Sequence, residues 1–450
     1  MARTPRLAWL VVALALGVRL ALLGYLGDAT GFHQAERAAR GVTWDWGYEQ
    51  GAIAQALVDG RGFSDPFLRG SGPTGWAAPL YPLLVAALLK LFGGVVYGAA
   101  VALAALQAIA SAFVSLWLWR LARALAPADP AVEERAAQGA YIASRIRQWV
   151  RGGDCAGALA ALLWALHPLA AYLPVTLVWD STFVALGLSW FLARVAEEGP
   201  AAPASTVARL GAGFGVLLLV NPAPLALTPA LLWYWAGPRG LKPGARNGAA
   251  FVAAAALVAG PWALRNLAVL GTPNLRSNLG VELYVGNNDG ARGTFNGPLH
   301  PAYNDLEYAQ YLELGEVPYA AHCQARAVAW AKANPARFAR LSLDRAQRFW
   351  FGPLPWQPIV LGSGAERRRD WQGWIEWLTH AGVGLLGLAG ACWARLRPGG
   401  ATLIRGALVL YPLVYYVTHV FERYRFPLEP VVVASAALLL ARLARRFVAR

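Results

Sequence analysis

The sequence WDWGYE at residues 44–49, continued by GRGFSDPF at 60–67 and GPTGW at 72–76, decides how the whole chain is interpreted. It follows directly after the first long apolar segment and carries the carboxylates Asp45, Glu49 and Asp65 among aromatic residues and glycines. Carboxylates at such a place are too polar to fill a membrane. We therefore predict an outer loop after a first transmembrane helix, and this loop is the first place to look for a catalytic base.

The composition predicts that the rest of the chain is a membrane bundle. Of its 450 residues 57% are hydrophobic and only 14% are charged, whereas a soluble chain is roughly a quarter charged. The net charge of +15 is spread between apolar segments, which indicates membrane topology and contact with anionic lipid rather than nucleic-acid binding. The three cysteines are too few and too dispersed for a disulfide framework or a metal cluster. We expect no cofactor and no metal site, and nothing in the sequence indicates a divalent cation.

We predict an all-α polytopic membrane protein that forms a single domain over residues 1–450. About ten apolar segments are long enough to be crossings, and residues 7–27 are expected to be a retained signal anchor. Two large outer loops, residues 28–95 and 270–373, should carry juxtamembrane helices, with helix-like stretches at 318–334 and 335–351. Residues 76–92 are apolar but contain Pro79, Pro82 and Lys90, so we place them in the first loop. The expected crossings are 7–27, 96–119, 156–173, 176–194, 206–221, 223–237, 248–269, 374–394, 403–421 and 427–445.

The basic connectors set the orientation of these crossings. With residues 76–92 kept out of the membrane, the N-terminus, the C-terminus and the arginine-rich connectors all fall on one side. The positive-inside rule makes this side the cytoplasm. Both termini are then expected to be cytoplasmic, and both large loops extracytoplasmic.

Ionisable residues gather at the predicted outer ends of the crossings. Such groups are costly near membrane depth and are functional candidates for that reason. Arginines bind phosphate by charge-assisted contacts, and a carboxylate can deprotonate an attacking hydroxyl or amine. The candidates outside the first loop are Asp180 at the start of the fourth crossing, Arg265 at the end of the seventh, Arg276 and Asn278 at the start of the second outer loop, and Arg423, Tyr424 and Arg425 in a short outer turn.

Several short motifs resemble a known family. WGYE at 46–49, GRGFS at 60–64, PLYP at 79–82, PWALRN at 261–266, RSNLG at 276–280 and RYR at 423–425 resemble bacterial lipid-carrier-dependent membrane glycosyltransferases. These belong to the glycosyltransferase C superfamily, near its aminoarabinose-transferase and protein O-mannosyltransferase branch. The resemblance covers most of the chain in order.

The resemblance implies a function and a set of roles. It implies an enzyme of a bacterial inner (plasma) membrane, a hexosyl- or pentosyltransferase that acts in the cell envelope. The enzyme would move a sugar, with inversion, from a polyprenyl-phosphate donor to a lipid, glycan or protein acceptor at the extracytoplasmic face. Its base would be a first-loop acid, Glu49 first, then Asp45 and Asp65. Arg423 and Arg425, with Arg265 in support, would hold the carrier phosphate, and Asp180 would orient the acceptor or an arginine.

Other interpretations remain open from the sequence. The unusual insertion at residues 31–40 makes Asp28 and Glu36 competitors for the role of base. Glu49 and Asp180 could instead be ordinary carboxylates at helix N-termini, and Arg423 and Arg425 could be interfacial arginines that reach toward water. Arg276 and Asn278 suit loop architecture or acceptor contacts. The rival functions are a transporter or flippase for lipid-linked sugars, a polysaccharide polymerase or ligase, and a non-catalytic subunit of a glycan assembly system.

Overall fold

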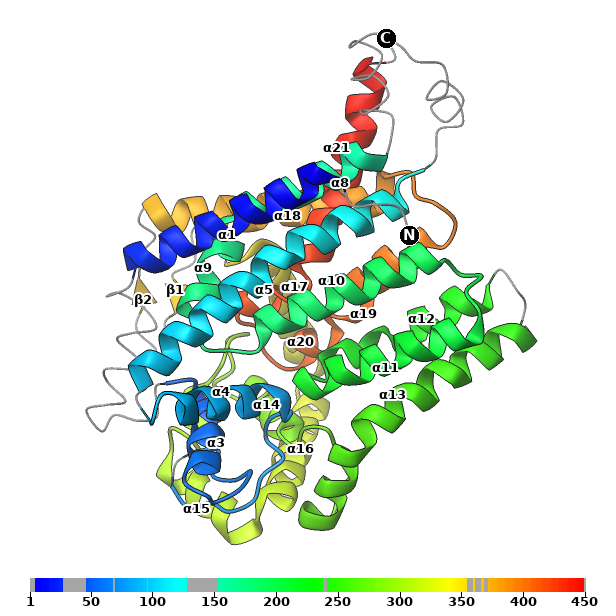
Figure 1. Ribbon diagram of the computed structural model, residues 1–450. Coiled ribbons are helices and arrows are strands. Elements are labelled where there is room, and N and C mark those ends of the chain that lie inside the picture. The colour runs from blue at the N-terminus through cyan, green and yellow to red at the C-terminus, as the bar shows by residue number, and fades with distance from the viewer. Residues whose placement is uncertain are drawn as a thin grey trace.

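The computed structural model describes residues 5–26, 46–67, 69–94, 96–127, 153–237, 241–353, 359–360, 366–367 and 371–448. These residues are mostly helical, with one antiparallel pair of two-residue strands, β1 (Ile359–Val360) and β2 (Glu366–Arg367). The predicted all-α class is therefore confirmed (Figure 1). The bundle helices are α1 (Arg6–Leu26), α5 (Val96–Leu125), α8 (Gly153–Leu166), α9 (Pro168–Thr176), α10 (Ser181–Glu198), α11 (Ala204–Val220), α12 (Thr228–Ala236), α13 (Leu241–Leu270), α18 (Trp371–Trp393), α19 (Gly400–Leu410), α20 (Leu413–Val417) and α21 (Glu429–Val448).

Helices occupy all ten segments that the sequence marks as crossings. Five of them, Arg6–Leu26, Val96–Leu125, Pro243–Leu270, Gly373–Trp393 and Gly400–Val417, are long and apolar enough to cross a membrane. The pair α8 and α9, bent by 49° at its break, makes a sixth if it counts as one span. The remaining helices, among them α11 and α12, do not pass this test alone. The exact number of crossings therefore stays a prediction.

Helix ends that the predicted topology places on the same side of the membrane lie close together in the structure. Arg120 near the end of α5 pairs with Glu197 at the end of α10 at 2.6 Å, and Arg123 pairs with Asp154 at the start of α8 at 3.2 Å. The start of α1 packs against the end of α5 in the same region. The opposite end of the bundle carries the two loops with α3 (Tyr48–Val58), α4 (Leu80–Leu91), α14 (Leu279–Gly286), α15 (Asp305–Leu314) and α16 (Glu316–Ala333), as Figure 1 shows. We call it the loop end.

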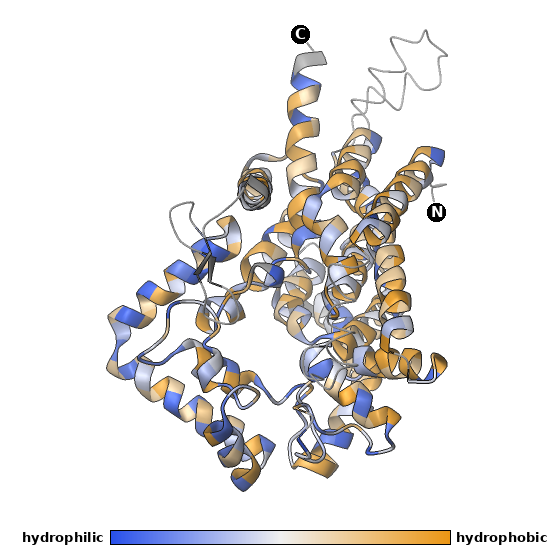
Figure 2. Cartoon of the chain, turned by 90° about the vertical axis from the view of Figure 1, so that its left-hand side faces the viewer, coloured by the Kyte–Doolittle hydropathy of each residue, from blue (hydrophilic) through white to orange (hydrophobic). Residues whose placement is uncertain are grey.

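The bundle buries a few strongly polar side chains, and helix breaks explain one of them. Arg19 of α1 is fully buried. It donates to the carbonyl oxygens of Trp164 and Ala165 at 3.2 Å, where α8 stops before Pro168 and leaves carbonyls without helical partners. His167 caps the next helix by accepting a hydrogen bond from the Ala170 amide. Figure 2 shows that apolar residues otherwise cover most of the bundle helices.

The segment 76–92 forms a short helix and not a long span. α4 covers Leu80–Leu91 and is about 18 Å long at 1.5 Å per residue, against roughly 30 Å of membrane hydrocarbon. It packs on α3 and the start of α5 through Tyr81, Val85 and Leu89. A helix of this length is too short to cross the hydrocarbon, and the assignment of residues 76–92 to the first loop stays a prediction.

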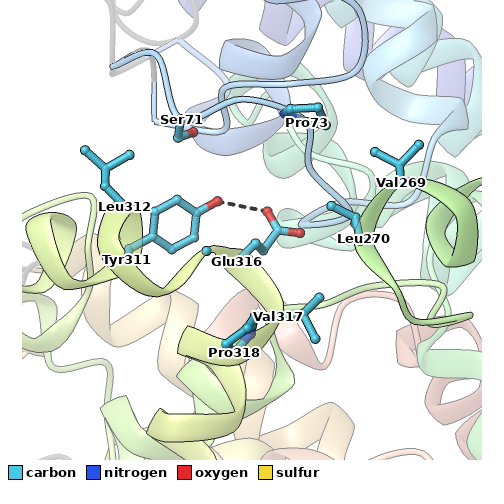
Figure 3. A pocket seen from close by; sticks show the side chains of 10 residues that line it. Ser71, Pro73, Val269, Leu270, Tyr311, Leu312, Glu316, Val317 and Pro318 are labelled. Carbon is cyan, nitrogen blue, oxygen red and sulfur yellow. Dashed lines mark hydrogen bonds between the residues drawn. The ribbon is translucent and has the colours of Figure 1, made fainter.

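One carboxylate joins the two outer loops. Glu316 at the start of α16 accepts hydrogen bonds from the Gly75 amide at 2.7 Å, the Ser277 hydroxyl at 2.6 Å, the Tyr311 hydroxyl at 2.9 Å and the Thr74 hydroxyl. Both of its oxygens accept hydrogen bonds, so it is a clamp and not a free acid. Figure 3 shows the bond from the Tyr311 hydroxyl. It borders a pocket of about 290 Å³ between the first loop, the end of α13 and α16.

Replacing Glu316 by alanine should loosen the loop end. E316A leaves four donors without their acceptor, and each such bond to a charged group contributes about 1.5–3 kcal/mol. We expect the variant to unfold at a clearly lower temperature in detergent, while the exposed E313A unfolds like the wild type. Equal melting temperatures for the two variants would contradict the clamp.

Candidate active site at the loop end of the bundle

Three carboxylates and two arginines from separate segments share one site at the loop end. Glu49 lies in the first turn of α3, Asp180 directly precedes α10, and Glu282 lies in the first turn of α14. Both Arg276 and Arg423 act electrostatically on all three carboxylates. The structure therefore brings together four residues that the sequence singles out, and it adds Glu282.

The start of α3 fixes the position of Glu49. Gly47 has φ 76°, and a Cβ there would lie 3.0 Å from Val178. A Cβ on Gly51 would lie 1.8 Å from the carbonyl oxygen of Trp46. Only glycines allow the chain to turn this tightly into the helix, so the motif WGYE presents Glu49 at a defined place. The Glu49 side chain is 16% exposed.

Burial and the neighbouring arginines shift the pKa of Glu49 in opposite directions. Burial raises the pKa of Glu49, and the charges of Arg276 and Arg423 oppose this rise. His300 lies beside it, with Nε2 3.8 Å from Oε1 of Glu49. Burial lowers the pKa of His300 to about 3, and its Nδ1 accepts a hydrogen bond from the Ala302 amide. The ring is therefore neutral and carries its proton on Nε2, toward Glu49.

Asp180 is held by two amides. Its Oδ2 accepts from Gln50 at 3.3 Å and from Asn221 at 3.0 Å. Gln50 follows Glu49 in α3, and Asn221 ends α11, so Asp180 links the first loop to the bundle. Asp180 makes no side-chain hydrogen bond that caps α10. Helix capping therefore does not explain the carboxylate at this position.

The side chains of Arg276 and Arg423 make few hydrogen bonds within the protein. Arg276 donates Nε to the carbonyl oxygen of Trp76 at 3.1 Å. Arg423 lies over the rings of Phe421 and Trp179, at 4.4 and 4.9 Å, and over Tyr424 at 5.6 Å. Its Nε is buried and has no hydrogen-bond partner among the described residues. An unpaired buried donor on a cation is suited to receive an anion.

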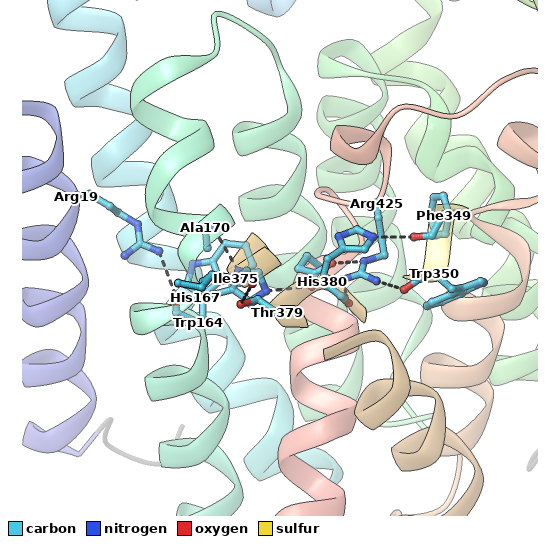
Figure 4. A network of polar contacts seen from close by, with 11 residues as sticks. Arg19, Trp164, His167, Ala170, Phe349, Trp350, Ile375, Thr379, His380 and Arg425 are labelled. Carbon is cyan, nitrogen blue, oxygen red and sulfur yellow. Dashed lines mark hydrogen bonds and ion pairs between the residues drawn. The ribbon is translucent and has the colours of Figure 1, made fainter. Parts of the chain in front are cut away.

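Arg425 has a different environment from Arg423. It is fully buried and forms a bidentate pair with Glu429, at 2.5 and 2.8 Å. It also donates to the carbonyl oxygens of Trp350 and His380 (Figure 4). Its donors are thus used within the protein, and the prediction that Arg425 binds phosphate finds no support in these contacts. It instead ties the turn that bears Arg423 to α17 (Pro335–Phe351) and α18.

Arg265 and Asn278 also serve the architecture. Arg265 donates to the carbonyl oxygens of Thr74 and Phe63 at 2.6 and 3.0 Å and lies over the ring of Trp262. It anchors the first loop to α13. Asn278 donates to Oε1 of Glu282 at 2.8 Å and so orients that carboxylate.

The acidic residues of the first loop differ in their surroundings. Asp65 is buried, accepts from the Gly72 amide at 2.8 Å and pairs with Arg61. These bonds close a loop that an isolated bridge between Ser64 and Pro73 also holds. Asp45, Asp28 and Glu36 lie outside the described residues. Glu49 is thus the first-loop carboxylate that the structure places among the arginines.

In the sequence Glu282 stands among the polar residues that open the second loop but receives no role of its own, and the structure places it in the site. Its side chain is 25% exposed, and its Oε2 lies 3.6 Å from Nδ1 of His419. The Nε2 of His419 in turn lies 2.9 Å from the Tyr424 hydroxyl. Tyr424 is thereby connected to Glu282 through His419. A usable signal was present, because Asn278 and Glu282 are four residues apart on one helix face.

The fold and site define a multi-helix protein with a carboxylate–arginine site where two large loops meet the loop end of the bundle. No protein-family model matches the chain, and no curated protein matches it. Among solved structures it is similar to the crystal structure of the Archaeoglobus fulgidus oligosaccharyltransferase tethered with an acceptor peptide containing the NVT sequon. The match has 13% sequence identity and a TM-score of 0.49, over 97% of this chain and 49% of that chain. The chain thus spans about half the length of that protein, and a likeness at this level carries no functional argument.

The two arginines of the turn should respond differently to substitution. R425M removes the bidentate cationic partner of the buried Glu429 and leaves it His167 at 3.2 Å. Breaking a buried ion pair in this way costs about 3–5 kcal/mol. R423M removes no hydrogen bond between described residues and should cost far less. Thermal unfolding of both variants in detergent measures this difference, and an equal loss of stability would contradict the assignment.

Proposed function

We propose that the protein is a membrane glycosyltransferase that moves a sugar from a polyprenyl-phosphate donor to an acceptor at the loop end. The observation that carries this proposal is the convergence of Glu49, Asp180 and Glu282 with Arg276 and Arg423. Sugar transfer from a lipid phosphate needs a base and a cation for the departing phosphate. The loop end offers both beside the bundle helices that would lie in the membrane.

The reaction balances with these groups. Glu49 takes the proton of the acceptor hydroxyl or amine, and the acceptor atom forms a bond to the anomeric carbon. The bond between that carbon and the phosphate oxygen breaks, and its electron pair leaves with the phosphate. Arg423 and Arg276 stabilise the charge that develops there. Attack from the face opposite the phosphate inverts the anomeric centre, and Asp180 orients the acceptor.

An apolar groove supports a lipid-linked donor. It has a volume of about 490 Å³ and lies between α5, α10 and α11, lined by residues such as Trp117, Phe183, Trp190 and Val216. Phe183 follows Asp180 by three residues, and the groove residue Val220 directly precedes Asn221, which binds Asp180. The groove therefore begins where the polar site ends. In this proposal the isoprenoid chain of the donor occupies it.

Two observations favour transfer over transport. The buried polar residues of the bundle, Arg19, His167, Arg425 and Glu429, bond to one another or to backbone carbonyls. A transporter would instead need polar groups that remain available along a route across the membrane. At the loop end, by contrast, Nε of Arg423 is buried and has no hydrogen-bond partner among the described residues. Among the described residues no group of three His, Cys, Asp or Glu is arranged to hold a metal ion.

Replacing Glu49 by glutamine should abolish transfer. Loss of a general base costs about 10²–10⁴-fold in rate, whereas the exposed control E313Q should keep the wild-type rate. The assay follows transfer by purified protein from a polyprenyl-lipid extract, with products detected by mass spectrometry. Because burial raises the pKa of Glu49, the wild-type rate should rise with pH as this carboxyl ionises. Full activity of E49Q would remove the proposed base.

Filling the groove should change how the enzyme discriminates between lipid chains. Val216 is half exposed in the groove, so V216W adds bulk there without disturbing Glu49 or Arg423. We expect KM to rise at least about tenfold for a long-chain polyprenyl-phosphate donor, the cost of roughly 1.4 kcal/mol of binding. For a short, water-soluble isoprenyl donor KM should be unchanged. An equal effect on both donors would argue against a chain in this groove.

A further inference from the structure

The contacts of Glu282 leave part of its carboxyl group available for chemistry. α14 is wedged tightly, because a Cβ on Gly280 would lie 2.0 Å from the carbonyl oxygen of Ala320 and one on Gly286 1.9 Å from that of Thr418. The helix is thereby fixed between α16 and the end of α20. Glu282 projects from this rigid element, keeps a quarter of its side chain exposed and receives one hydrogen bond, from Asn278. In Glu316, by contrast, both carboxylate oxygens already accept hydrogen bonds.

We propose that Glu282 is a second catalytic residue, the acid that protonates the departing phosphate oxygen while Glu49 accepts the acceptor proton. This inference rests on the proposed glycosyl transfer. It assigns opposite tasks to two carboxylates that face the same pair of arginines.

The surroundings of Glu282 favour its protonated form. Burial raises the pKa of Glu282 to about 7, and the charge of Glu49 adds to the rise, against the opposing effect of Arg276 and Arg423. The charge of Glu49, once ionised, helps to hold the proton on Glu282. Two interacting carboxylates lose their protons in steps that belong to the pair. The groups facing Glu282 are Arg276 from the segment before α14, Glu49 from α3, Arg423 and Tyr424 from the turn before α21, and Tyr415 and His419 from α20 and its end.

The chemistry benefits from such an acid. The donor phosphodiester carries one negative charge, and the phosphate that departs would otherwise gain a second. A proton from the Glu282 carboxyl goes to the phosphate oxygen as its bond to the anomeric carbon breaks. The products are the glycoside and singly protonated polyprenyl phosphate. The proton that Glu49 received then returns to Glu282, so no net proton is consumed.

The pH dependence of transfer separates this role from a structural one. The rate should rise at low pH as Glu49 ionises and fall as the pH passes about 7, where Glu282 loses its proton. E282Q keeps the size of the side chain and an oxygen to accept from Asn278, but it has no proton to give. We expect kcat to fall about 10²–10⁴-fold, with little change in donor KM, and the remaining activity to lack the alkaline decline. E282D should restore part of kcat together with that decline.

The outcomes distinguish this inference from the proposed function. If E49Q is inactive while E282Q keeps wild-type kcat and the alkaline decline, the transferase stands and the role of Glu282 fails. If the wild type transfers no sugar from the polyprenyl-lipid extract, the proposed function itself fails. Should E282Q not fold, the pH–rate profile of the wild type decides alone. A rate that keeps rising well above pH 7 would contradict the role of Glu282 as the acid. E313Q serves as the matched control in each case.

Discussion

The carboxylate of Glu316 is the contact on which the arrangement of the site depends. It accepts hydrogen bonds from Thr74 and Gly75 of the first loop and from Ser277 and Tyr311 of the second. Glu49 lies on the first loop, whereas Arg276 and Glu282 lie on the second. The clamp therefore holds a candidate base from one part of the chain against the charges of another, at the end of a bundle that contributes Asp180 and Arg423.

Arg423 differs from Arg19 and Arg425 of the bundle in how its side-chain donors are used. Arg425 and Glu429 neutralise each other within the bundle, and Arg19 is satisfied by carbonyls at a helix break. Arg423 is held only two residues from Arg425, yet its Nε has no partner among the described residues. The stable pair thus supports a turn whose neighbouring arginine is left free to bind an anion. The same contrast separates Glu316, which is fully bonded, from Glu49 and Glu282.

The sequence predicted the fold class and part of the site for physical reasons. Apolar length and the distribution of arginines place the loops at one end of the bundle, so the convergence of Glu49, Asp180, Arg276 and Arg423 could be anticipated. The different environments of Arg423 and Arg425 could not be read from the motif RYR. Arg425 lies in the turn before α21, and its pairing with Glu429, the first residue of that helix, appears only in the folded chain. The sequence places Glu282 among the polar residues that open the second loop, but it gives no reason to assign this carboxylate a role. Only the packing of α14 shows that it faces the arginines.

The identity of the reaction products decides whether the protein transfers a sugar from a lipid phosphate. Purified protein is incubated with a polyprenyl-lipid extract and its acceptors, and the lipids and glycosylated products are then analysed by mass spectrometry. The account predicts that free polyprenyl phosphate and a newly glycosylated acceptor appear together, and that neither appears with R276M/R423M. Polyprenyl-phosphate sugars that stay intact with the folded wild-type protein would contradict it.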